Sequence, residues 1–492
     1  MNIKRFLLLL IALISFGNLM NAQIKFRKVI GNTGYDYGVS AQQTIDSGYV
    51  LVGSTSSFGA GSTDIYMVKT DSLGVPYWHQ AFGGINIDRG TCVKQTADSG
   101  YVILGYTNSY GAGGYDFYLI KLDKNYNTSW SKTYGGSNWD FGNCVEQTAD
   151  GGYIICGETY SFGNGDEDYY IIKTDMNGDT TWTKTFGGTE QDIAKSIIQT
   201  SDGNYLVTGT SKSNGDIDGD FYTLKLNATT GDSLWSNKYG GAAADFSNDV
   251  VESMFGGYLL TGESKNFGLG NSHAILVKIS PLGVTDSIKT IIGGTLDDKF
   301  LSVTEDANGK VSMAGTTKSY GDGSGNGDIF FYTLKSDWSY YGLTTFGTLQ
   351  RDDGFSVEPT NDNAFIICGT SNGFNMGIDD VYLIKTDTLC FASVPEVSFF
   401  TAIPESIVAA EINFSIYPNP ANDKINIDLS LFQGKTIIEL FDALGKNIFD
   451  EILEVKGNEN IVIETENLKQ GMYMIRVSDN ISVKTQKIIV QH

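Results

Sequence analysis

The sequence is poor in basic residues and in histidine. It contains 34 Lys and Arg against 57 Asp and Glu, which gives a formal net charge of -23 at pH 7. A chain of that charge repels nucleic acid and anionic lipid, so no nucleic-acid partner is expected. The 3 histidines, His79, His273 and His492, do not stand at the spacing of metal ligands. A histidine-based zinc site is therefore not expected.

Long apolar runs are missing beyond the N-terminus. Lys4 and Arg5 precede an apolar run from Phe6 to Ile14, and NLMNAQ then offers a cleavage point after Ala22. This order is typical of a secretory signal peptide, here residues 1–22. The run is too short to cross a bilayer, and no later stretch approaches the required length. We expect an exported chain without a transmembrane segment.

Cysteine is scarce and odd in number. The 5 cysteines stand at positions 92, 144, 156, 368 and 390, and an odd count in an exported protein leaves at least one thiol unpaired. We interpret them as small apolar core residues. A Cys92–Cys144 bridge stays open, because the sequence does not give the geometry that decides it.

Glycine and aromatic residues are abundant, and they recur in a fixed rhythm. The 59 Gly, 27 Tyr and 27 Phe are typical of short strands joined by tight turns. One glycine marks each of seven copies, 52 to 54 residues apart: Gly53, Gly105, Gly157, Gly209, Gly262, Gly315 and Gly369. An aspartate recurs in the same rhythm: Asp36, Asp88, Asp140, Asp192, Asp245, Asp298 and Asp352. A lysine is the third marker: Lys69, Lys121, Lys173, Lys225, Lys278, Lys335 and Lys385.

Each copy contains four strand-like runs, in the third copy GNCVEQT, GYIICGETY, DYYIIKTD and TTWTKTFGG. The fold class predicted is all-β, a seven-bladed β-propeller over residues 24–390. A β-solenoid is the alternative, but 52 residues is long for one coil. The array also opens with a fourth run, IKFRKVIGN, and stops after a third, YLIKTDTLC. We expect the N-terminal strand to complete the last blade, which leaves no open edge.

The turn before the fourth run has its own pattern. KTDMNGDTTW, KTDSLGVPYW and KLDKNYNTSW place Asp, usually Gly, then Trp at fixed offsets. The tryptophans of this series are Trp78, Trp130, Trp182 and Trp235. The pattern resembles the tryptophan-docking repeats of quinoprotein-like propellers, in which the ring wedges between blades. The resemblance implies blade architecture only. Later copies depart from it, with Ile288 in one and Tyr341 or Trp338 in another.

The repeat rhythm ends before the C-terminus. Residues 391–411 are predicted as a linker, and residues 412–492 as a small β-sandwich-like domain. SIYPNPANDKINI, LKQGMYMIRV and KIIV resemble the type A C-terminal sorting domain of type IX secretion cargo. The motif residues are Tyr417, Pro418, Asn419, Pro420, Gly471, Tyr473 and Lys487. The resemblance implies the type IX secretion machinery as a partner, a secreted or outer-surface location, and attachment to outer-membrane lipopolysaccharide as one outcome.

The repeated aspartates follow an aromatic-Gly-Gly turn, where a carboxylate can accept hydrogen bonds from backbone N–H groups. Structural capping is our interpretation of this series. A ring of carboxylates at one mouth of the channel and a repeated Asp–Lys pairing are the alternatives.

Binding sites arise more readily where a repeat varies. The residue before each repeated aspartate differs in every blade: Tyr35, Ile87, Trp139, Gln191, Ala244, Asp297 and Arg351. Of these, Tyr35, Trp139, Asp297 and Arg351 suit a site for sugars or peptides. Ordinary loop variation is the plainer interpretation.

No cofactor is expected, except that calcium is a candidate. DIDGD and DGSGNGD put side-chain oxygens at alternate positions, at Asp216, Asp218 and Asp220 and at Asp322 and Asp328. Solvated turns explain both stretches equally well, and neither completes an EF-hand.

We expect a secreted or cell-surface module that binds a glycan, peptide or protein, and not an enzyme. A polysaccharide-active enzyme with Asp/Glu catalysis is the alternative, although the sequence singles out no carboxylate pair. A purely structural surface component is the third possibility.

Overall fold

The computed structural model describes residues 23–213, 218–266, 272–321, 326–374, 377–392, 396–397, 416–429, 434–442, 447–455, 460–478 and 483–491. The predicted signal peptide, residues 1–22, lies outside the described residues, as does most of the predicted linker. The chain divides into two compact units, Met1–Phe400 and Thr401–His492. Each unit is described by itself below.

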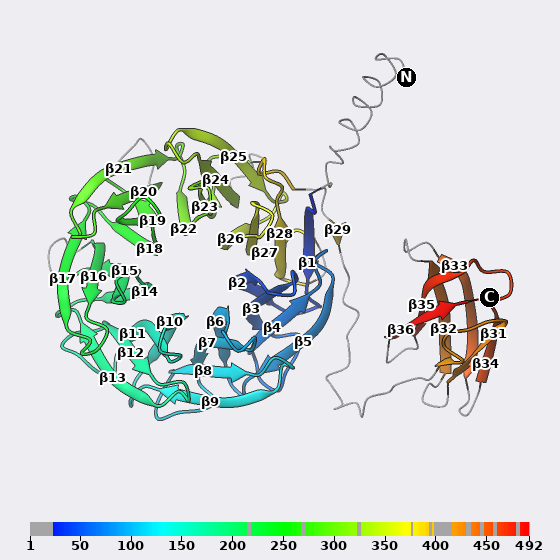
Figure 1. Ribbon diagram of the computed structural model, residues 1–492. Coiled ribbons are helices and arrows are strands. Elements are labelled where there is room, and N and C mark those ends of the chain that lie inside the picture. The colour runs from blue at the N-terminus through cyan, green and yellow to red at the C-terminus, as the bar shows by residue number, and fades with distance from the viewer. Residues whose placement is uncertain are drawn as a thin grey trace, which may run out of the picture. The chain divides into compact units, whose positions relative to one another are not determined.

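The first unit is built of seven antiparallel sheets that form a ring (Figure 1). Six sheets take four consecutive strands each. They are β2–β5 (Asp36–Gln43, Tyr49–Thr55, Asp64–Thr70, Pro76–Phe82), β6–β9 (Asp88–Gln95, Tyr101–Thr107, Asp116–Leu122, Thr128–Tyr134), β10–β13 (Asp140–Gln147, Tyr153–Thr159, Asp168–Thr174, Thr180–Phe186), β14–β17 (Asp192–Gln199, Tyr205–Ser211, Asp220–Leu226, Ser233–Tyr239), β18–β21 (Asp245–Glu252, Tyr258–Ser264, His273–Ile279, Thr285–Ile292) and β22–β25 (Asp298–Glu305, Val311–Thr317, Asp328–Leu334, Tyr340–Phe346). The predicted all-β, seven-bladed propeller is confirmed.

The seventh blade joins the two ends of the array. It contains β26 (Asp352–Pro359), β27 (Phe365–Ser371), β28 (Asp380–Lys385) and β1 (Phe26–Ile30), so the N-terminal strand is its fourth strand. β1 pairs antiparallel with β28, with Phe26 opposite Lys385. A short strand, β29 (Glu396–Val397), adds parallel to the outer edge of β1. The predicted closure by the N-terminal strand is therefore confirmed.

The repeated glycine marks a close approach of two backbones. In the third blade, β10 has a bulge between Gly142 and Cys144, opposite Gly157 of β11. A Cβ atom on Gly157 would lie 2.0 Å from the carbonyl oxygen of Phe141. No side chain fits there, because Cβ atoms essentially never approach an oxygen that closely. The bulge tightens the local twist of the innermost strand, which lines the channel.

The tryptophans lie against the next blade. The indole of Trp130 lies over Gly178, that of Trp182 over Gly231 and that of Trp235 over Gly283. Each of these glycines has a positive φ, 77°, 72° and 77° respectively. In the first blade Trp78 stacks on Tyr126 instead, with 4.6 Å between ring centroids. The fourth strand of each of these blades therefore packs an aromatic ring onto the turn of its neighbour.

The sixth blade breaks this pattern in a way that the sequence did not reveal. In the third blade, Trp182 pairs with Lys173 of the neighbouring strand. In the sixth blade the equivalent pair is Gly342 and Thr333, so a glycine stands at the tryptophan position. Neither Tyr341 nor Trp338 takes the tryptophan position. Trp338 occupies the positive-φ turn position instead, with a φ of 67°.

Replacing Trp182 with alanine should lower the free energy of unfolding by about 2–4 kcal/mol. The indole is half-buried, donates a hydrogen bond of 3.3 Å from Nε1 to the Ala228 carbonyl oxygen, and packs near Tyr205. Chemical denaturation of W182A and of the parent chain measures the difference. A loss below about 1 kcal/mol would show that the indole does not hold the third and fourth blades together.

Five of the marker lysines pair with an aspartate outside the repeated Asp36 series. Lys69, Lys121, Lys173, Lys225 and Lys385 bind the turn aspartates Asp46, Asp98, Asp150, Asp202 and Asp362, with Nζ–Oδ distances of 2.9–3.1 Å. The lysines are nearly inaccessible to solvent and hold the turn between the first and second strands. Lys335 is two residues out of register, because Thr333 holds the marker position in β24.

The second unit is a β domain with two sheets. One has the order β30 (Ile416–Tyr417), β31 (Lys424–Asp428) and β34 (Asn460–Glu464). The other has the order β33 (Asn447–Val455), β32 (Gly434–Asp442), β35 (Gly471–Ser478) and β36 (Val483–Val490). Both sheets contribute to one apolar core, which includes Ile425, Leu440 and Ile475.

Asn419 joins the first and last sequence motifs of this domain. Its Nδ2 donates to the Lys487 carbonyl oxygen at 3.0 Å, and its Oδ1 accepts from the Ile489 N–H at 2.9 Å. The peptide bonds before Pro418 and Pro420 are cis. Tyr417 is exposed, whereas Tyr473 is buried and donates its hydroxyl to the Lys469 carbonyl oxygen.

Candidate functional site

The first strand of every blade begins at the same end of the ring, which we call the loop mouth. The repeated aspartates are the first residues of these strands, and all seven are at most 2% exposed. In each blade the carboxylate accepts a hydrogen bond of 2.7–2.9 Å from the backbone N–H four residues earlier. The carboxylates are thus turned into the protein and do not form a charged ring around the channel.

A second aspartate series, which the sequence analysis missed, lies beside the first. The third strands begin with Asp64, Asp116, Asp168, Asp220, His273, Asp328 and Asp380. At each blade junction, this residue and the repeated aspartate of the next blade both lie next to the same glycine. The seven glycines are Gly31, Gly83, Gly135, Gly187, Gly240, Gly293 and Gly347. At Gly135, for example, a Cβ atom would lie 2.0 Å from Asp116 Oδ1 and 2.6 Å from Asp140 Oδ2.

Six of the seven junctions bring together two buried carboxylates, which repel each other, whereas the remaining junction pairs His273 with Asp298. Burial raises the pKa of Asp116 and of Asp168, and the charge of the facing aspartate adds to the rise. The effect is strongest at the junction of the seventh and first blades, where burial and the neighbouring Asp36 raise the pKa of Asp380 to about 7. Asp116, Asp168 and Asp380 therefore resist ionisation at their blade junctions.

The variable residues stand on a backbone frame that does not vary. The residue after each second strand donates its N–H to the carbonyl oxygen of the residue before the repeated aspartate, at 2.7–3.1 Å in all seven blades. This bond sets side by side the pairs Tyr35 and Ser56, Ile87 and Asn108, Trp139 and Tyr160, Gln191 and Lys212, Ala244 and Lys265, Asp297 and Lys318, and Arg351 and Asn372. The same geometry thus presents a different pair of side chains in every blade.

One part of the mouth is aromatic. Tyr106, Tyr115, Trp139, Phe141 and Tyr160, which we call the aromatic shelf, form edge-to-face and tilted contacts with ring centroids 5.0–6.4 Å apart. Trp139 is 52% exposed. It leans on Gly114, where a Cβ atom would lie 2.0 Å from the indole. The shelf therefore offers a supported but solvent-facing ring.

Another part of the mouth is charged and hollow. A cavity of about 500 Å³ spans the fifth to seventh blades and is lined by Phe246, Glu263, Lys265, Ser272, Asp297, Lys299, Thr316, Lys318, Asn326, Arg351 and Asp353. A second cavity of about 180 Å³ is also lined by Phe246 and Glu263, and it extends to Gln191, which directly precedes the first strand of the fourth blade. Lys318 Nζ lies 3.1 Å from Asp297 Oδ2, and Arg351 Nε lies 2.6 Å from Asp353 Oδ2.

The four predicted binding residues fall into separate groups. Asp297 and Arg351 line the charged cavity together. Trp139 belongs to the aromatic shelf, and Tyr35 stacks on Tyr37 with 6.2 Å between ring centroids. The sequence analysis missed Lys265, Lys299 and Lys318. A comparison of the seven copies at two further positions would have found them. Lys299 stands one residue after a repeated aspartate, and Lys265 and Lys318 stand one residue after a second strand.

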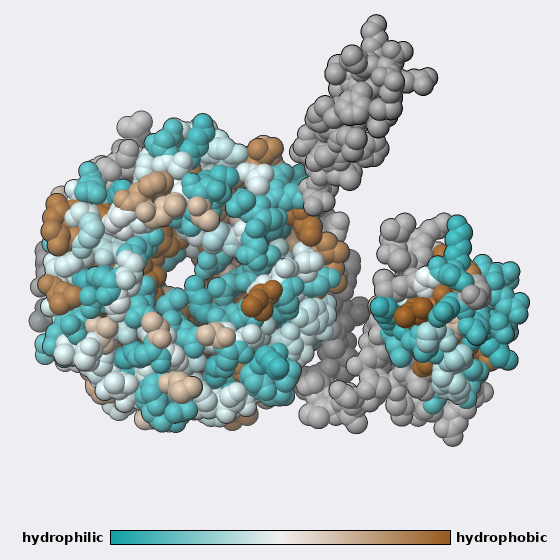
Figure 2. Space-filling view, viewed as in Figure 1, coloured by the Kyte–Doolittle hydropathy of each residue, from teal (hydrophilic) through white to brown (hydrophobic). Residues whose placement is uncertain are grey.

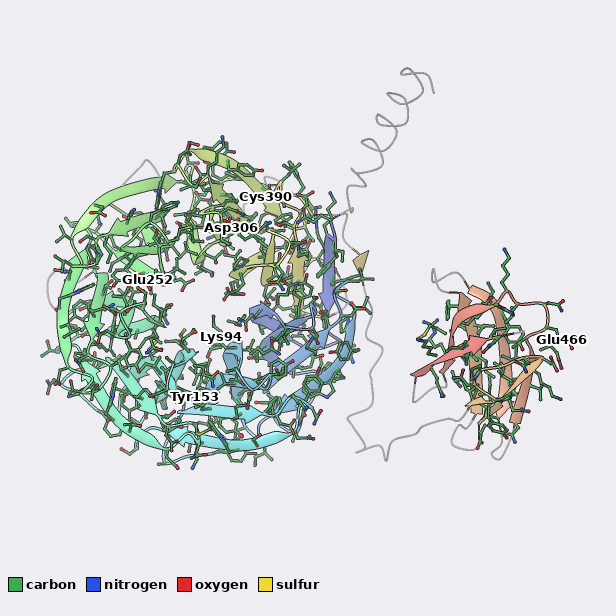
Figure 3. All side chains as sticks on the ribbon, in the orientation of Figure 1. Lys94, Tyr153, Glu252, Asp306, Cys390 and Glu466 are labelled. Carbon is green, nitrogen blue, oxygen red and sulfur yellow. The ribbon has the colours of Figure 1, made fainter. Side chains whose placement is uncertain are left out.

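The channel itself contains a small charged cluster. The space-filling view shows the ring open at its centre (Figure 2). Lys94 of β6 points into this space (Figure 3), and its Nζ lies 3.0 Å from Glu358 Oε1 and 3.9 Å from Glu146 Oε2. Glu358 holds the pKa of Lys94 well above its ordinary value. Burial raises the pKa of Glu146, and Lys94 opposes that rise.

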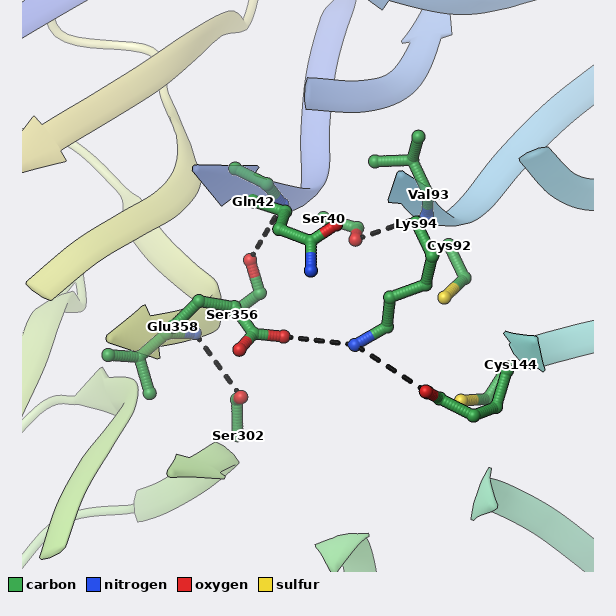
Figure 4. Close-up of polar contacts among 12 residues, drawn as sticks. Ser40, Gln42, Cys92, Val93, Lys94, Cys144, Ser302, Ser356 and Glu358 are labelled. Carbon is green, nitrogen blue, oxygen red and sulfur yellow. Dashed lines mark hydrogen bonds and ion pairs between the residues drawn. The ribbon is translucent and has the colours of Figure 1, made fainter. Parts of the chain in front are cut away.

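The cavity around Lys94, about 260 Å³ in volume, is lined by one small or polar residue from each first strand: Ser40, Cys92, Cys144, Ser196, Asp249, Ser302 and Ser356. Figure 4 shows Ser40, Cys92, Cys144, Ser302 and Ser356 around Lys94. Residues of this series link neighbouring blades. Ser196 Oγ donates to Asp249 Oδ1 at 2.7 Å, and Ser302 Oγ donates to Asp249 Oδ2 at 3.0 Å. Cys92 and Cys144 are neighbours in this series, and all five thiols of the chain are free.

The residues predicted as calcium ligands do not form one site among the described residues. Asp216 and Asp322 lie outside the described residues, and Asp218 is exposed. Asp220 and Asp328 are buried first residues of β16 and β24 and belong to the junction pairs. The described residues contain no group of three or more His, Cys, Asp or Glu side chains arranged for a metal ion. Calcium binding stays a prediction.

Comparisons with known proteins assign the C-terminal unit. Residues 415–491 match the family model of the secretion system C-terminal sorting domain. The chain is 24% identical over 298 residues to the regulatory protein FlaEY of Caulobacter vibrioides, which covers 54% of this chain and 30% of that protein. It therefore spans less than a third of that relative's length.

Two solved structures match this chain only weakly. A protein of unknown function from Bacteroides caccae matches with 14% identity and a TM-score of 0.37, over 59% of this chain and 90% of that one. Sqt1 from Chaetomium thermophilum matches with 12% identity and a TM-score of 0.41, over 70% of this chain and 81% of that one.

The sorting domain fixes the destination of the chain. Its match indicates export by type IX secretion, so the protein is secreted or held at the outer cell surface, and the secretion machinery is a partner. Within the described part of the chain there is no helix long and apolar enough to cross a bilayer.

Proposed function

We propose that the propeller is an extracellular binding module whose loop mouth takes a glycan. The observation that carries the proposal is the invariant backbone frame that presents a different side-chain pair in each blade. Residues that serve only the fold repeat from blade to blade, as the buried aspartates do. Residues that vary on a fixed frame at a concave, solvent-facing mouth are the usual means of recognition.

The aromatic shelf supports a sugar in particular. An exposed indole that rests on a glycine backbone is held in place before any ligand arrives, so little side-chain freedom is lost on binding. The apolar face of a sugar ring can pack on such a surface. Attachment to outer-membrane lipopolysaccharide, which the sorting-domain resemblance implies, would display this mouth at the cell surface.

Replacing Trp139 with alanine should weaken glycan binding about tenfold, which corresponds to about 1.4 kcal/mol. The thermal midpoint should stay within about 2 °C of the parent, because the indole is 52% exposed. A glycan array on the purified chain from Gln23 onward, with and without calcium, identifies the ligand, and titration of the W139A variant follows. An equally large loss of stability would assign Trp139 to the core and contradict the proposal.

A second candidate function is hydrolysis of the bound glycan. Glu146 and Glu358 both face the ammonium of Lys94 within 4 Å, so two carboxylates meet in one cavity, and burial keeps the pKa of Glu146 raised. Glycoside hydrolysis uses two carboxyl groups, one as general acid and the other as general base or nucleophile. This activity would be established if the parent chain hydrolyses a glycan found on the array and both the E146Q and the E358Q variants fail to hydrolyse it. Binding without turnover would leave the cluster as a structural ion pair.

A further inference from the structure

We infer that the glycan is an acidic polysaccharide with about one carboxylate or sulfate per sugar, bound along a cationic arc on the fourth to seventh blades. This inference rests on the proposed function, since it names the ligand class of the same mouth. The cationic arc comprises Lys212, Lys265, Lys299, Lys318 and Arg351.

The first argument is the repetition of charge within the variable frame. The residue after the second strand is lysine in three successive blades, at Lys212, Lys265 and Lys318. The matching positions of the other blades are Ser56, Asn108, Tyr160 and Asn372. Because the same backbone hydrogen bond holds this position in every blade, the three lysines stand at equivalent places in successive blades around the mouth. A polymer with regularly spaced anions matches such a row.

The second argument is the state of these cations. Lys212, Lys265 and Lys299 have no carboxylate partner among the described residues. The buried marker lysines of the first four blades do have one. Lys318 is paired with Asp297, but both side chains are 43% exposed. Arg351 is paired with Asp353, and the arginine side chain is 66% exposed. Three of the five cations of the arc can therefore pair with an anionic ligand without first giving up a carboxylate partner.

The third argument concerns the density of charge. Glu263, Asp297 and Asp353 lie among the cations and reduce the local positive charge. The surrounding acidic protein also repels a ligand as highly charged as nucleic acid. A cavity of about 500 Å³ with a continuation of about 180 Å³ has room for a few sugar rings. A uronic-acid or lightly sulfated glycan fits both the volume and the modest charge.

The test uses ligands that differ only in charge. Oligogalacturonate is titrated against its fully methyl-esterified form, and chondroitin sulfate against desulfated and carboxyl-reduced chondroitin, with the full exported chain at 50 and 300 mM salt. We expect the acidic member of at least one pair to bind at least tenfold more tightly than its neutral form. The difference should shrink at high salt, because exposed ion pairs are screened.

The variant arm separates the arc from the total charge of the protein. The double variant Lys265→Met and Lys318→Met should weaken binding of the acidic ligand at least tenfold. The control Lys124→Met and Lys335→Met makes the same charge change in exposed turns at the opposite end of the blades, and it should change binding less than twofold. Both double variants should unfold at the parent temperature.

The possible outcomes distinguish this inference from the proposed function. If neutral and acidic members bind equally, or only neutral glycans are found on the array, the inference is overturned while glycan binding stands. If a single-stranded DNA oligonucleotide binds more tightly than every acidic glycan, the cationic arc serves another polyanion and the inference also fails. If no glycan of either kind binds, both the inference and the proposed function are wrong.

Discussion

The variant G157A should lose about 3 kcal/mol or more of its free energy of unfolding, or fail to fold. The new methyl group would lie 2.0 Å from the Phe141 carbonyl oxygen and 2.6 Å from the ring of Phe117. The oxygen belongs to the bulged innermost strand, which is fixed on its other side by the neighbouring blades. The clash can be relieved only by moving that strand, and overpacking a rigid interior is destabilising.

Gly342 provides the matched control. It lies in β25, a methyl group added to it would meet no atom within 4 Å, and its φ is not positive. G342A should therefore be as stable as the parent or gain a few tenths of a kcal/mol, because alanine restricts the unfolded chain. Denaturant unfolding of both variants measures the contrast. Equal stability of G157A and G342A would refute the close approach at the bulge.

The second large effect is expected at the junction of the seventh and first blades. D380N should stabilise the propeller by about 2 kcal/mol at pH 8, with the gain vanishing below about pH 4. Asp380 is 1% exposed, and burial together with Asp36 raises its pKa from 3.8 to about 7. The folded state therefore binds more protons than the unfolded chain between these values. Stability contributed by the protonated group is present below pH 4 and is lost as the pH rises through 7.

The opposite sign is expected for the turn aspartates. Partial burial works to raise the pKa of Asp98, but hydrogen bonds from Thr96 and Lys121 outweigh it and hold the pKa at about 2. D98N should therefore be less stable than the parent at pH 7, and the difference should disappear as the pH falls toward 2. Unfolding curves of D380N, D98N and the parent across pH 3–8 measure both effects. Parallel pH profiles for the two variants would contradict the assignment of the junction pair.

The repeat made the fold predictable, and its exceptions limited the prediction. Three markers in one rhythm indicated seven blades, and the split repeat indicated the closing strand. The register of the sixth blade could not be predicted, because Lys335 and Trp338 imitate the expected residue types two and four positions from their places. Only the pairing of β24 with β25 shows that Thr333 and Gly342 hold the positions of the marker lysine and the tryptophan in this blade.

The site was less accessible to sequence reasoning. Variation before the repeated aspartate led to Asp297 and Arg351, which do share a cavity. The lysines of the cationic arc come from two other positions of the repeat, and only the curvature of the ring brings these positions together. The ion pair of Lys94 and Glu358 joins the second and seventh blades. Local sequence patterns do not predict such a pair, because the two residues are far apart in the chain. The second aspartate series was hidden because His273 interrupts it.

The closing strand also sets the order in which the molecule can be completed. Six blades consist of consecutive chain and can form from local contacts, but the seventh needs Phe26–Ile30 and Asp380–Lys385 together. Within the propeller, the first and the last strands in chain order are thus the two that must pair, and such a contact has a high loop-closure entropy cost. Until β1 pairs with β28, the outer edge of β28 has no strand partner. A chain that lacks residues 23–30 would lack β1, so the seventh blade would keep only three of its four strands.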